Sequence, residues 1–179
     1  MFLKGRTCYI SGPLEFDHLC EDWRTPLKRV LRDEFGVNYF DPSLDPKQNK
    51  AALLRQLKTE GRWKELSKIA HEFVRADLSI VDRADFLIVC LPYRVPVFGT
   101  IHELIFSSNA KKPTLLVCSD GKDKIASWAF GFIREEFIFG SWEELYGYLR
   151  KVDRGDEKDN DRWYFVYHYY HDGKQWLFR

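Results

Sequence analysis

The sequence lacks the features that would place the protein in a specialised class. Its 179 residues include 28 basic and 27 acidic side chains, giving a formal net charge of +1. No excess of charge therefore points to nucleic acid, a membrane surface or an acidic partner. The longest clean apolar run, Phe86 to Leu91, is far shorter than the roughly 18 residues of a membrane helix. The N-terminus has no secretory pattern, so we expect a soluble, cytoplasmic protein.

Paired cysteines and clustered metal ligands are also missing. The four cysteines are Cys8, Cys20, Cys90 and Cys118. None forms a C-x-x-C pair and three lie in apolar, strand-like runs, which favours reduced, partly buried thiols. Only His168 and His171 are close together among the histidines, without a third ligand in view. We expect no metal and no other cofactor.

Strands alternate with helices along most of the chain. Short apolar runs predict strands over 5–11, 37–42, 84–91, 112–118 and 135–140. Helical spacing predicts a helix capped by Asp17 or Thr25, two helices within 46–82 divided by Gly61, and helices over 100–110, 122–131 and 141–151. The last of these begins with a capping box from Ser141 to Glu144. This order predicts an α/β fold with an open, doubly wound, flavodoxin- or Rossmann-like parallel sheet of five strands, with helices on both faces.

The C-terminal part differs in composition from the rest. Residues 152–162 are nearly all charged or small and indicate a solvated linker between an α/β domain over 1–151 and a tail over 163–179. The tail alternates aromatic and polar residues around Asp172-Gly173, which predicts a β-hairpin. Its aromatics could stack on single-stranded nucleic acid, but the small net charge makes burial against the domain or a second subunit the favoured interpretation.

Glu103 is the most informative residue, and two interpretations of it compete. Thr100 to Glu103 reads T-x-x-E before an apolar run, so Glu103 can close a capping box and do no chemistry. However, a long loop with two prolines and Gly99 precedes the helix, and such loops are often functional. Ligands of doubly wound sheets bind at the carboxyl ends of the strands, where a carboxylate can act as a nucleophile.

Asp77 is a second candidate carboxylate. It lies among apolar residues before the third strand, so a half-buried carboxylate there needs a partner. A salt bridge to Arg75 or Arg83 is the structural alternative. Asp85 directly precedes the same strand, where a role in a cap or turn is favoured.

Three segments, "CYISGP", "VRADLSIVDRADFLIVCLP" and "VFGTIHELIFSSNAKKPTLLV", occur in an order that resembles the nucleoside 2-deoxyribosyltransferase family. Relatives of that family include the deoxynucleoside 5′-monophosphate N-glycosidases and the CMP hydrolases. The likeness covers roughly residues 5 to 130. Each motif is weak by itself, and the ordered set is more specific.

The resemblance implies retaining cleavage of an N-glycosidic bond, with water or a second base as acceptor. Glu103 would attack the anomeric carbon, Asp77 would hold the proton that the departing base needs, and Tyr9 would orient the nucleophile. The further motif positions would contact the substrate: Ser11, Gly12, Pro13, Asp85, Gly99, Thr100 and Ser127. Ser127 would reach a neighbouring subunit's site, which implies a homodimer or a higher homo-oligomer.

One position departs from the family pattern. Where the family has an aspartate or serine six residues before the nucleophile, this sequence has Val97, which can neither bind a base by hydrogen bonds nor hold a phosphate. Substrate recognition must therefore differ, or the activity has changed. A non-catalytic nucleotide-binding or sensing module on the same fold is the alternative function.

Overall fold

The computed structural model describes residues 1–46, 50–171 and 174–179, and within them it has the expected doubly wound α/β fold. Five parallel strands form the sheet in the order β2-β1-β3-β4-β5. They are β1 (Thr7–Ser11), β2 (Asn38–Phe40), β3 (Phe86–Cys90), β4 (Thr114–Val117) and β5 (Ile138–Phe139). The predicted fold class is confirmed, including a C-terminal antiparallel hairpin of β6 (Tyr169–His171) and β7 (Trp176–Phe178).

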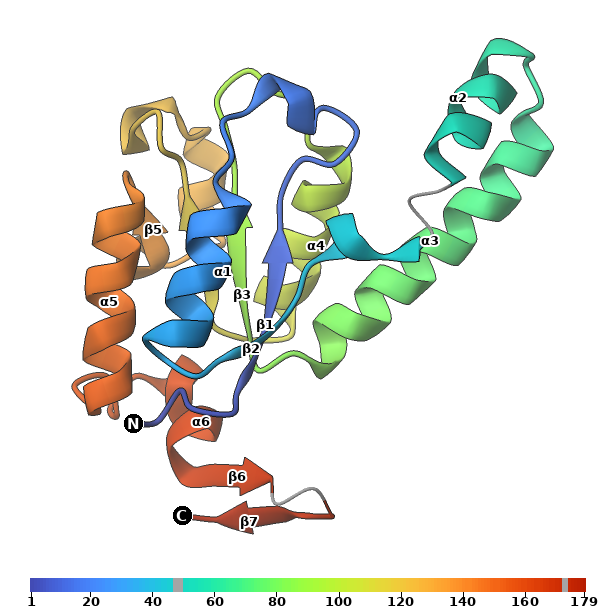
Figure 1. Cartoon of the computed structure of the whole chain (residues 1–179). Coiled ribbons are helices and arrows are strands. Elements are labelled where there is room, and N and C mark those ends of the chain that lie inside the picture. Colours follow the sequence, from blue (N-terminus) through green and yellow to red (C-terminus); the bar gives the residue numbers. More distant parts are fainter. Residues whose placement is uncertain (47–49, 172–173) are drawn as a thin grey trace.

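Helices cover both faces of the sheet (Figure 1). On one face lie α1 (Arg24–Asp33) and α5 (Trp142–Arg154), and on the other lie α4 (Phe98–Asn109) and the end of α3 (Trp63–Arg83). The central strand β3 is buried along its whole length, as a continuous apolar run between two helical layers must be. The first half of α3 and the helix α2 (Ala51–Thr59) project from the body as a helical arm (Figure 1).

The strand register sets the two edges of the sheet. Cys8 pairs with Phe86 and Ser11 pairs with Val89, so the carboxyl ends of β1 and β3 lie side by side. The loops after these strands contain Gly12 and Val97, and they meet at this carboxyl edge. The opposite edge holds the start of β1, the end of α3 and Asp85.

The observed helix boundaries agree with the predicted ones where a glycine or a capping residue sets them. Gly61 has φ +68° between α2 and α3, a left-handed conformation that glycine adopts without strain. Ser141 Oγ accepts a hydrogen bond from the Glu144 amide at 3.2 Å, and so the predicted cap of α5 is present. Other predicted boundaries differ from the structure.

The first difference is at α1, which begins at Arg24 with Trp23 at the cap position. Neither Thr25 nor Asp17 is that cap residue, and the Asp22 carboxylate accepts from the Thr25 amide at 3.0 Å instead. The second difference is over 122–131, where two short 3₁₀ turns, Lys122–Lys124 and Ser127–Gly131, replace the expected helix.

The C-terminal segment is more firmly attached than a linker and separate hairpin would be. Helix α5 continues to Arg154, and a short helix, α6 (Tyr164–His168), precedes the hairpin. Trp163 is fully buried and its indole N–H donates to the Tyr148 hydroxyl at 2.8 Å. The start of the tail is therefore part of the core, and the hairpin itself is shorter than 163–179. Its predicted turn, Asp172-Gly173, lies outside the described residues.

The remaining expectations concern membranes and metals. No helix in the described part of the chain is long and apolar enough to cross a bilayer. All four cysteines are free thiols. Within the same ranges, no three His, Cys, Asp or Glu side chains come together in a way that could hold a metal ion.

Candidate active site

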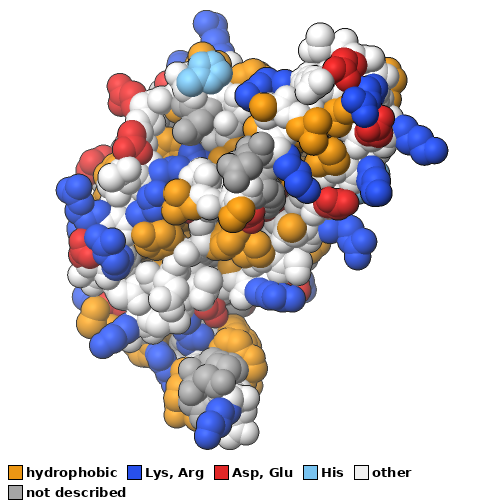
Figure 2. Space-filling model, turned by 45° about the vertical axis from the view of Figure 1, so that its right-hand side comes forward, with side chains coloured by type: hydrophobic (Ala, Val, Ile, Leu, Met, Phe, Trp, Pro, Cys, Tyr) orange, Lys and Arg blue, Asp and Glu red, His pale blue; other side chains and the backbone are white. Residues whose placement is uncertain are grey.

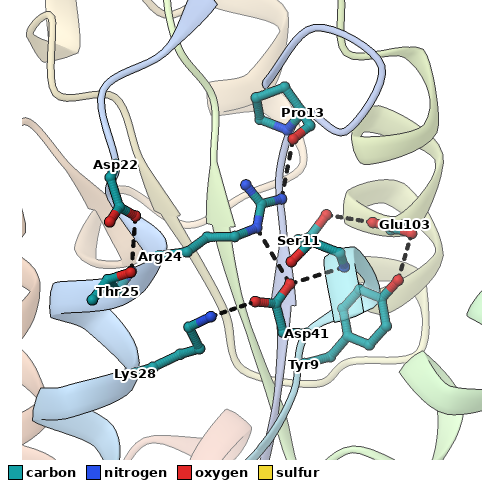
Figure 3. Close-up of polar contacts among 10 residues, drawn as sticks. Tyr9, Ser11, Pro13, Asp22, Arg24, Thr25, Lys28, Asp41 and Glu103 are labelled. Atoms are coloured by element: carbon teal, nitrogen blue, oxygen red, sulfur yellow. Dashed lines mark hydrogen bonds and ion pairs between the residues drawn. The ribbon is translucent and has the colours of Figure 1, made fainter. Parts of the chain in front are cut away.

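The Glu103 carboxylate accepts hydrogen bonds from two side chains of β1 (Figure 3). The Tyr9 hydroxyl donates to Oε1 at 2.7 Å, and the Ser11 hydroxyl donates to Oε2. Tyr9 and Ser11 are two residues apart in a strand, so both side chains point to the face that α4 covers. This spacing is what brings their two hydroxyls to one carboxylate.

The capping-box interpretation of Glu103 is wrong. Helix α4 begins at Phe98 rather than after Thr100, and its cap residue, Val97, makes no side-chain cap hydrogen bond. Thr100 is a buried residue inside the helix and cannot act as the N-cap. Glu103 therefore lies in the second turn, where the helix dipole has little influence.

Tyr9 is fully buried, and its hydroxyl contacts Glu103 of α4. Burial raises the pKa of its phenol well above the ordinary value, and the nearby carboxylates of Glu103 and Asp77 raise it further. The phenol is thus protonated at neutral pH and acts as a hydrogen-bond donor. Its ring stacks on Phe40 with centroids 5.7 Å apart, which fixes its position.

Asp77 lies on α3, partly buried, on the same side of the sheet as Tyr9 and Glu103. The charge of Asp77 also raises the pKa of the Tyr9 phenol. The hydrogen bonds of the site join Glu103 to Tyr9, as expected, and to Ser11.

Gly99 lies on the exposed surface one turn before Glu103. It is four residues before Glu103 in α4, so the two share a helix face. A Cβ placed on Gly99 would meet no other element of the described structure within 4 Å. The loop before α4 also contains Arg94 with φ +62°, a conformation that is costly for a residue with a side chain and is found more often near functional sites.

The first loop is held from behind by a buried ion cluster that the sequence analysis missed (Figure 3). Arg24 donates to the Pro13 carbonyl at 3.1 Å and to Asp41 at 3.3 Å. Lys28 donates to the other oxygen of Asp41 at 2.9 Å. Burial opposes ionisation of Asp41, but the hydrogen bonds from Ser43 and Lys28 and the charge of Arg24 lower its pKa overall. The available signal was Asp41 itself, an acid directly after a strand and before a proline.

Gly12 has a packing role at this loop. A Cβ there would lie 2.3 Å from the Trp23 ring, so only glycine fits while the ring covers it. Trp23 is itself stacked on Trp142, with centroids 5.4 Å apart. Gly12 therefore contacts Trp23 directly, whereas it was expected to face the substrate.

Two expected substrate contacts lie elsewhere. Asp85 is at the amino end of β3, at the opposite edge of the sheet, where it accepts from the Thr7 amide at 2.7 Å and pairs with Arg6 at 3.5 Å. Because parallel strands put their two ends at opposite edges, a residue before β3 cannot join a site after β1. Ser127 is exposed on a 3₁₀ turn after β4, outside the Tyr9, Ser11 and Glu103 cluster of its own chain.

Comparison with known proteins does not assign the chain to a family. No family model matches the chain, and no curated protein matches it. The likeness to the nucleoside 2-deoxyribosyltransferase family stays a prediction carried by the motifs. The geometry of the site is the independent observation.

Proposed function

We propose that this protein cleaves the N-glycosidic bond of a deoxynucleoside, nucleoside or nucleotide through a covalent intermediate on Glu103. The observation that carries this proposal is the Glu103 carboxylate, held by the hydroxyls of Tyr9 and Ser11 at the carboxyl edge of the sheet. Both donors are buried, so they hold the carboxylate in one orientation. A nucleophile needs such a fixed orientation for its attack.

The chemistry follows from that orientation. A Glu103 oxygen forms a bond to C1′ of the sugar while the bond from C1′ to the base nitrogen breaks, and the electron pair leaves with the base. Asp77, in its protonated form, gives the base its proton. A water molecule then attacks C1′ and gives a proton to the Asp77 carboxylate, while the bond from C1′ to Glu103 breaks and Glu103 leaves as a carboxylate. A second base can take the place of water.

Tyr9 serves as a positioning residue in this scheme. Its raised pKa keeps the phenol protonated, so it donates to the carboxylate throughout the pH range of most enzymes. Each carboxylate oxygen has two lone pairs, and accepting one hydrogen bond does not use both of them. Tyr9 can therefore hold Oε1 in place without blocking the reaction.

A homo-oligomer belongs to the same proposal. The exposed turn with Ser127 also carries Trp128, which is 85 % exposed. An exposed tryptophan of that size is costly in water, and a second subunit would cover it. Ser127 would then be delivered to the partner's site. The mass of the protein in solution tests this part separately.

A panel of nucleosides and 5′-monophosphates, each with and without a second free base, tests the activity. We expect released base, detected by chromatography, with the wild-type protein and none above background with Glu103→Gln. Glu143→Gln, on the solvent-facing side of α5, is the matched control and should release base at the wild-type rate. Binding of these compounds without turnover by the wild type would replace the enzyme with the nucleotide-binding module.

A further inference from the structure

A cavity lies at the opposite edge of the sheet from Glu103. It has a volume of about 450 Å³, which is in the size range of small-molecule sites. It is bounded by the start of β1, the end of α3 and the hairpin, which lies below the amino ends of the strands in Figure 1. Its lining residues are Lys4, Gly5, Arg6, Thr7, Arg83, Asp85, Tyr170, Trp176 and Arg179.

The charge of this lining is strongly one-sided. Four of the lining residues are basic, and among the described lining residues Asp85 alone is acidic. Asp85 is already engaged, since it pairs with Arg6 at 3.5 Å and accepts from the Thr7 amide at 2.7 Å. No other acidic side chain of the described cavity wall offsets the charges of Lys4, Arg83 and Arg179.

Arg6 is a positive charge that the fold holds in a fixed position at this cavity. It is only 4 % exposed, and its guanidinium donates to the Val166 and Tyr169 carbonyls as well as to Asp85. Burial lowers its pKa, Asp85 opposes that effect, and the nearby Arg179 lowers the pKa further. Arg6 and Arg179 both line the cavity, and an anion bound beside two guanidinium groups is stabilised by their charge.

Aromatic side chains of the hairpin complete the wall. Tyr170 is 38 % and Trp176 51 % exposed, and the Arg179 guanidinium lies 5.7 Å from the centre of the Tyr170 ring. The apolar character of the hairpin surface is visible at the lowest part of the molecule in Figure 2. Exposed rings next to unbalanced cations form a surface that suits a ligand with a flat ring and an anionic group.

We propose that this cavity is a second ligand site, which binds a small phosphate-bearing molecule with a planar ring, of the nucleotide class. Arg83, Lys4 and Arg179 would bind the phosphate, and the rings of the hairpin would contact the base. The site is separate from Glu103 because the two lie at opposite edges of the sheet. It stands whether or not Glu103 is a nucleophile.

A titration of the ¹⁵N-labelled full-length protein followed by NMR tests the proposal. The protein carries Glu103→Gln so that no ligand is consumed. AMP, ATP, inorganic phosphate, adenosine and a short single-stranded oligonucleotide are added in separate experiments. The site is reported by the amides of Gly5, Thr7 and Tyr170 and by the indole N–H of Trp176, and the first site by the amides of Gly12, Gly99 and Thr100.

We expect AMP or ATP to shift the signals of the second site, phosphate to shift them more weakly, and adenosine to leave them unchanged. The double substitution Lys4→Gln, Arg83→Gln should weaken nucleotide binding there by about tenfold or more, since charged hydrogen bonds to phosphate are lost. Arg29→Gln, on the exposed face of α1, removes one positive charge elsewhere and should leave binding unchanged.

Three results would overturn the proposal. Nucleotide shifts confined to Gly12, Gly99 and Thr100 would mean that only the first site binds. Equal weakening by Arg29→Gln and by the double substitution would mean unspecific attraction to charge. Tighter binding of the oligonucleotide than of ATP at the second site would replace the small ligand with single-stranded nucleic acid.

Discussion

At the scale of single residues, the candidate site depends on two hydroxyls that donate to one carboxylate. Tyr9 and Ser11 could be proposed from sequence because they lie in the short motif "YISGP", but their contact with Glu103 depends on how α4 packs on β1. Local sequence does not contain that packing. T-x-x-E looked like a capping box for a related reason. Helix α4 begins at Phe98, and no capping side chain there marks this start in the sequence.

Ser11→Ala should lower the rate of base release by about ten- to a hundredfold. It removes a hydrogen bond to a charged group, worth about 1.5–3 kcal/mol. The thermal midpoint should fall as well, because the same hydrogen bond is present in the folded protein without substrate. Steady-state kinetics and thermal unfolding of the variant measure both effects. Ser107→Ala, at a buried serine that contacts Thr114 instead, is the control and should keep the wild-type rate. An unchanged rate in Ser11→Ala would remove Ser11 from the site.

Tyr9 also makes a prediction about stability at high pH. Its pKa in the folded protein is raised above the ordinary value near 10. Above pH 10 the unfolded chain loses this proton while the folded chain keeps it, so the free energy of unfolding falls as the pH rises. The loss from this group is up to about 1.4 kcal/mol per pH unit. Tyr9→Phe should therefore lose less stability than the wild type between pH 9 and 11.

Urea denaturation at the two pH values measures this difference. Tyr164→Phe, at a half-exposed side chain, serves as the control and should follow the wild type. If Tyr9→Phe and the wild type lose stability equally, the phenol is not buried among carboxylates as the structure has it.

At the scale of elements, the loops that follow β1 and β3 meet at the carboxyl edge of the sheet, next to the candidate site. The alternation of strands and helices was enough to predict the sheet, and Gly61 and Ser141 were enough to place two helix boundaries. The buried cluster of Arg24, Lys28 and Asp41 was missed because it joins residues of α1 to the end of β2. Charged residues at those positions look like ordinary solvent-exposed ones until the fold is known.

Gly12 and Gly99 give a matched pair of substitutions. Gly12→Ala places a Cβ 2.3 Å from the Trp23 ring, so the ring or the loop must move. We expect a loss of about 1–3 kcal/mol in the free energy of unfolding, as for other overpacked cores. Gly99→Ala has open space and lies in a helix, so it should be neutral or stabilising by about 0.5–1 kcal/mol. Chemical denaturation of both variants gives the comparison, and equal stabilities would contradict the packing of Trp23 over Gly12.

At the scale of the whole molecule, the C-terminal segment closes the amino edge of the sheet and leaves the carboxyl edge to the candidate active site. Its composition predicted a linker and a hairpin but not its attachment, since Trp163 and Tyr167 pack onto α5 by tertiary contacts alone. Arg6 makes a further connection, from β1 to the backbone of 166 and 169. Hydrogen bonds to backbone carbonyls cannot be predicted from the sequence, because every residue has such a carbonyl.

Arg6→Gln should loosen this attachment without unfolding the sheet. It removes charged hydrogen bonds worth about 1.5–3 kcal/mol and leaves Asp85 without its ion pair. We expect faster hydrogen exchange at the amides of 164–171 and unchanged exchange in β1, β3 and β4, measured by mass spectrometry. Arg29→Gln should match the wild type. Unchanged exchange over 164–171 in Arg6→Gln would show that Arg6 does not hold the segment.

The central claim is that Glu103 becomes covalently bonded to the sugar. Its most direct test is mass spectrometry of the protein after acid quenching during turnover of a deoxynucleoside or its 5′-monophosphate, followed by digestion. We predict that the peptide with Glu103 gains the mass of the sugar residue without its base, and that Tyr9→Phe lowers the fraction labelled. Base release with no sugar on that peptide at any quench time, or a sugar on another residue in Glu103→Gln, would contradict the account.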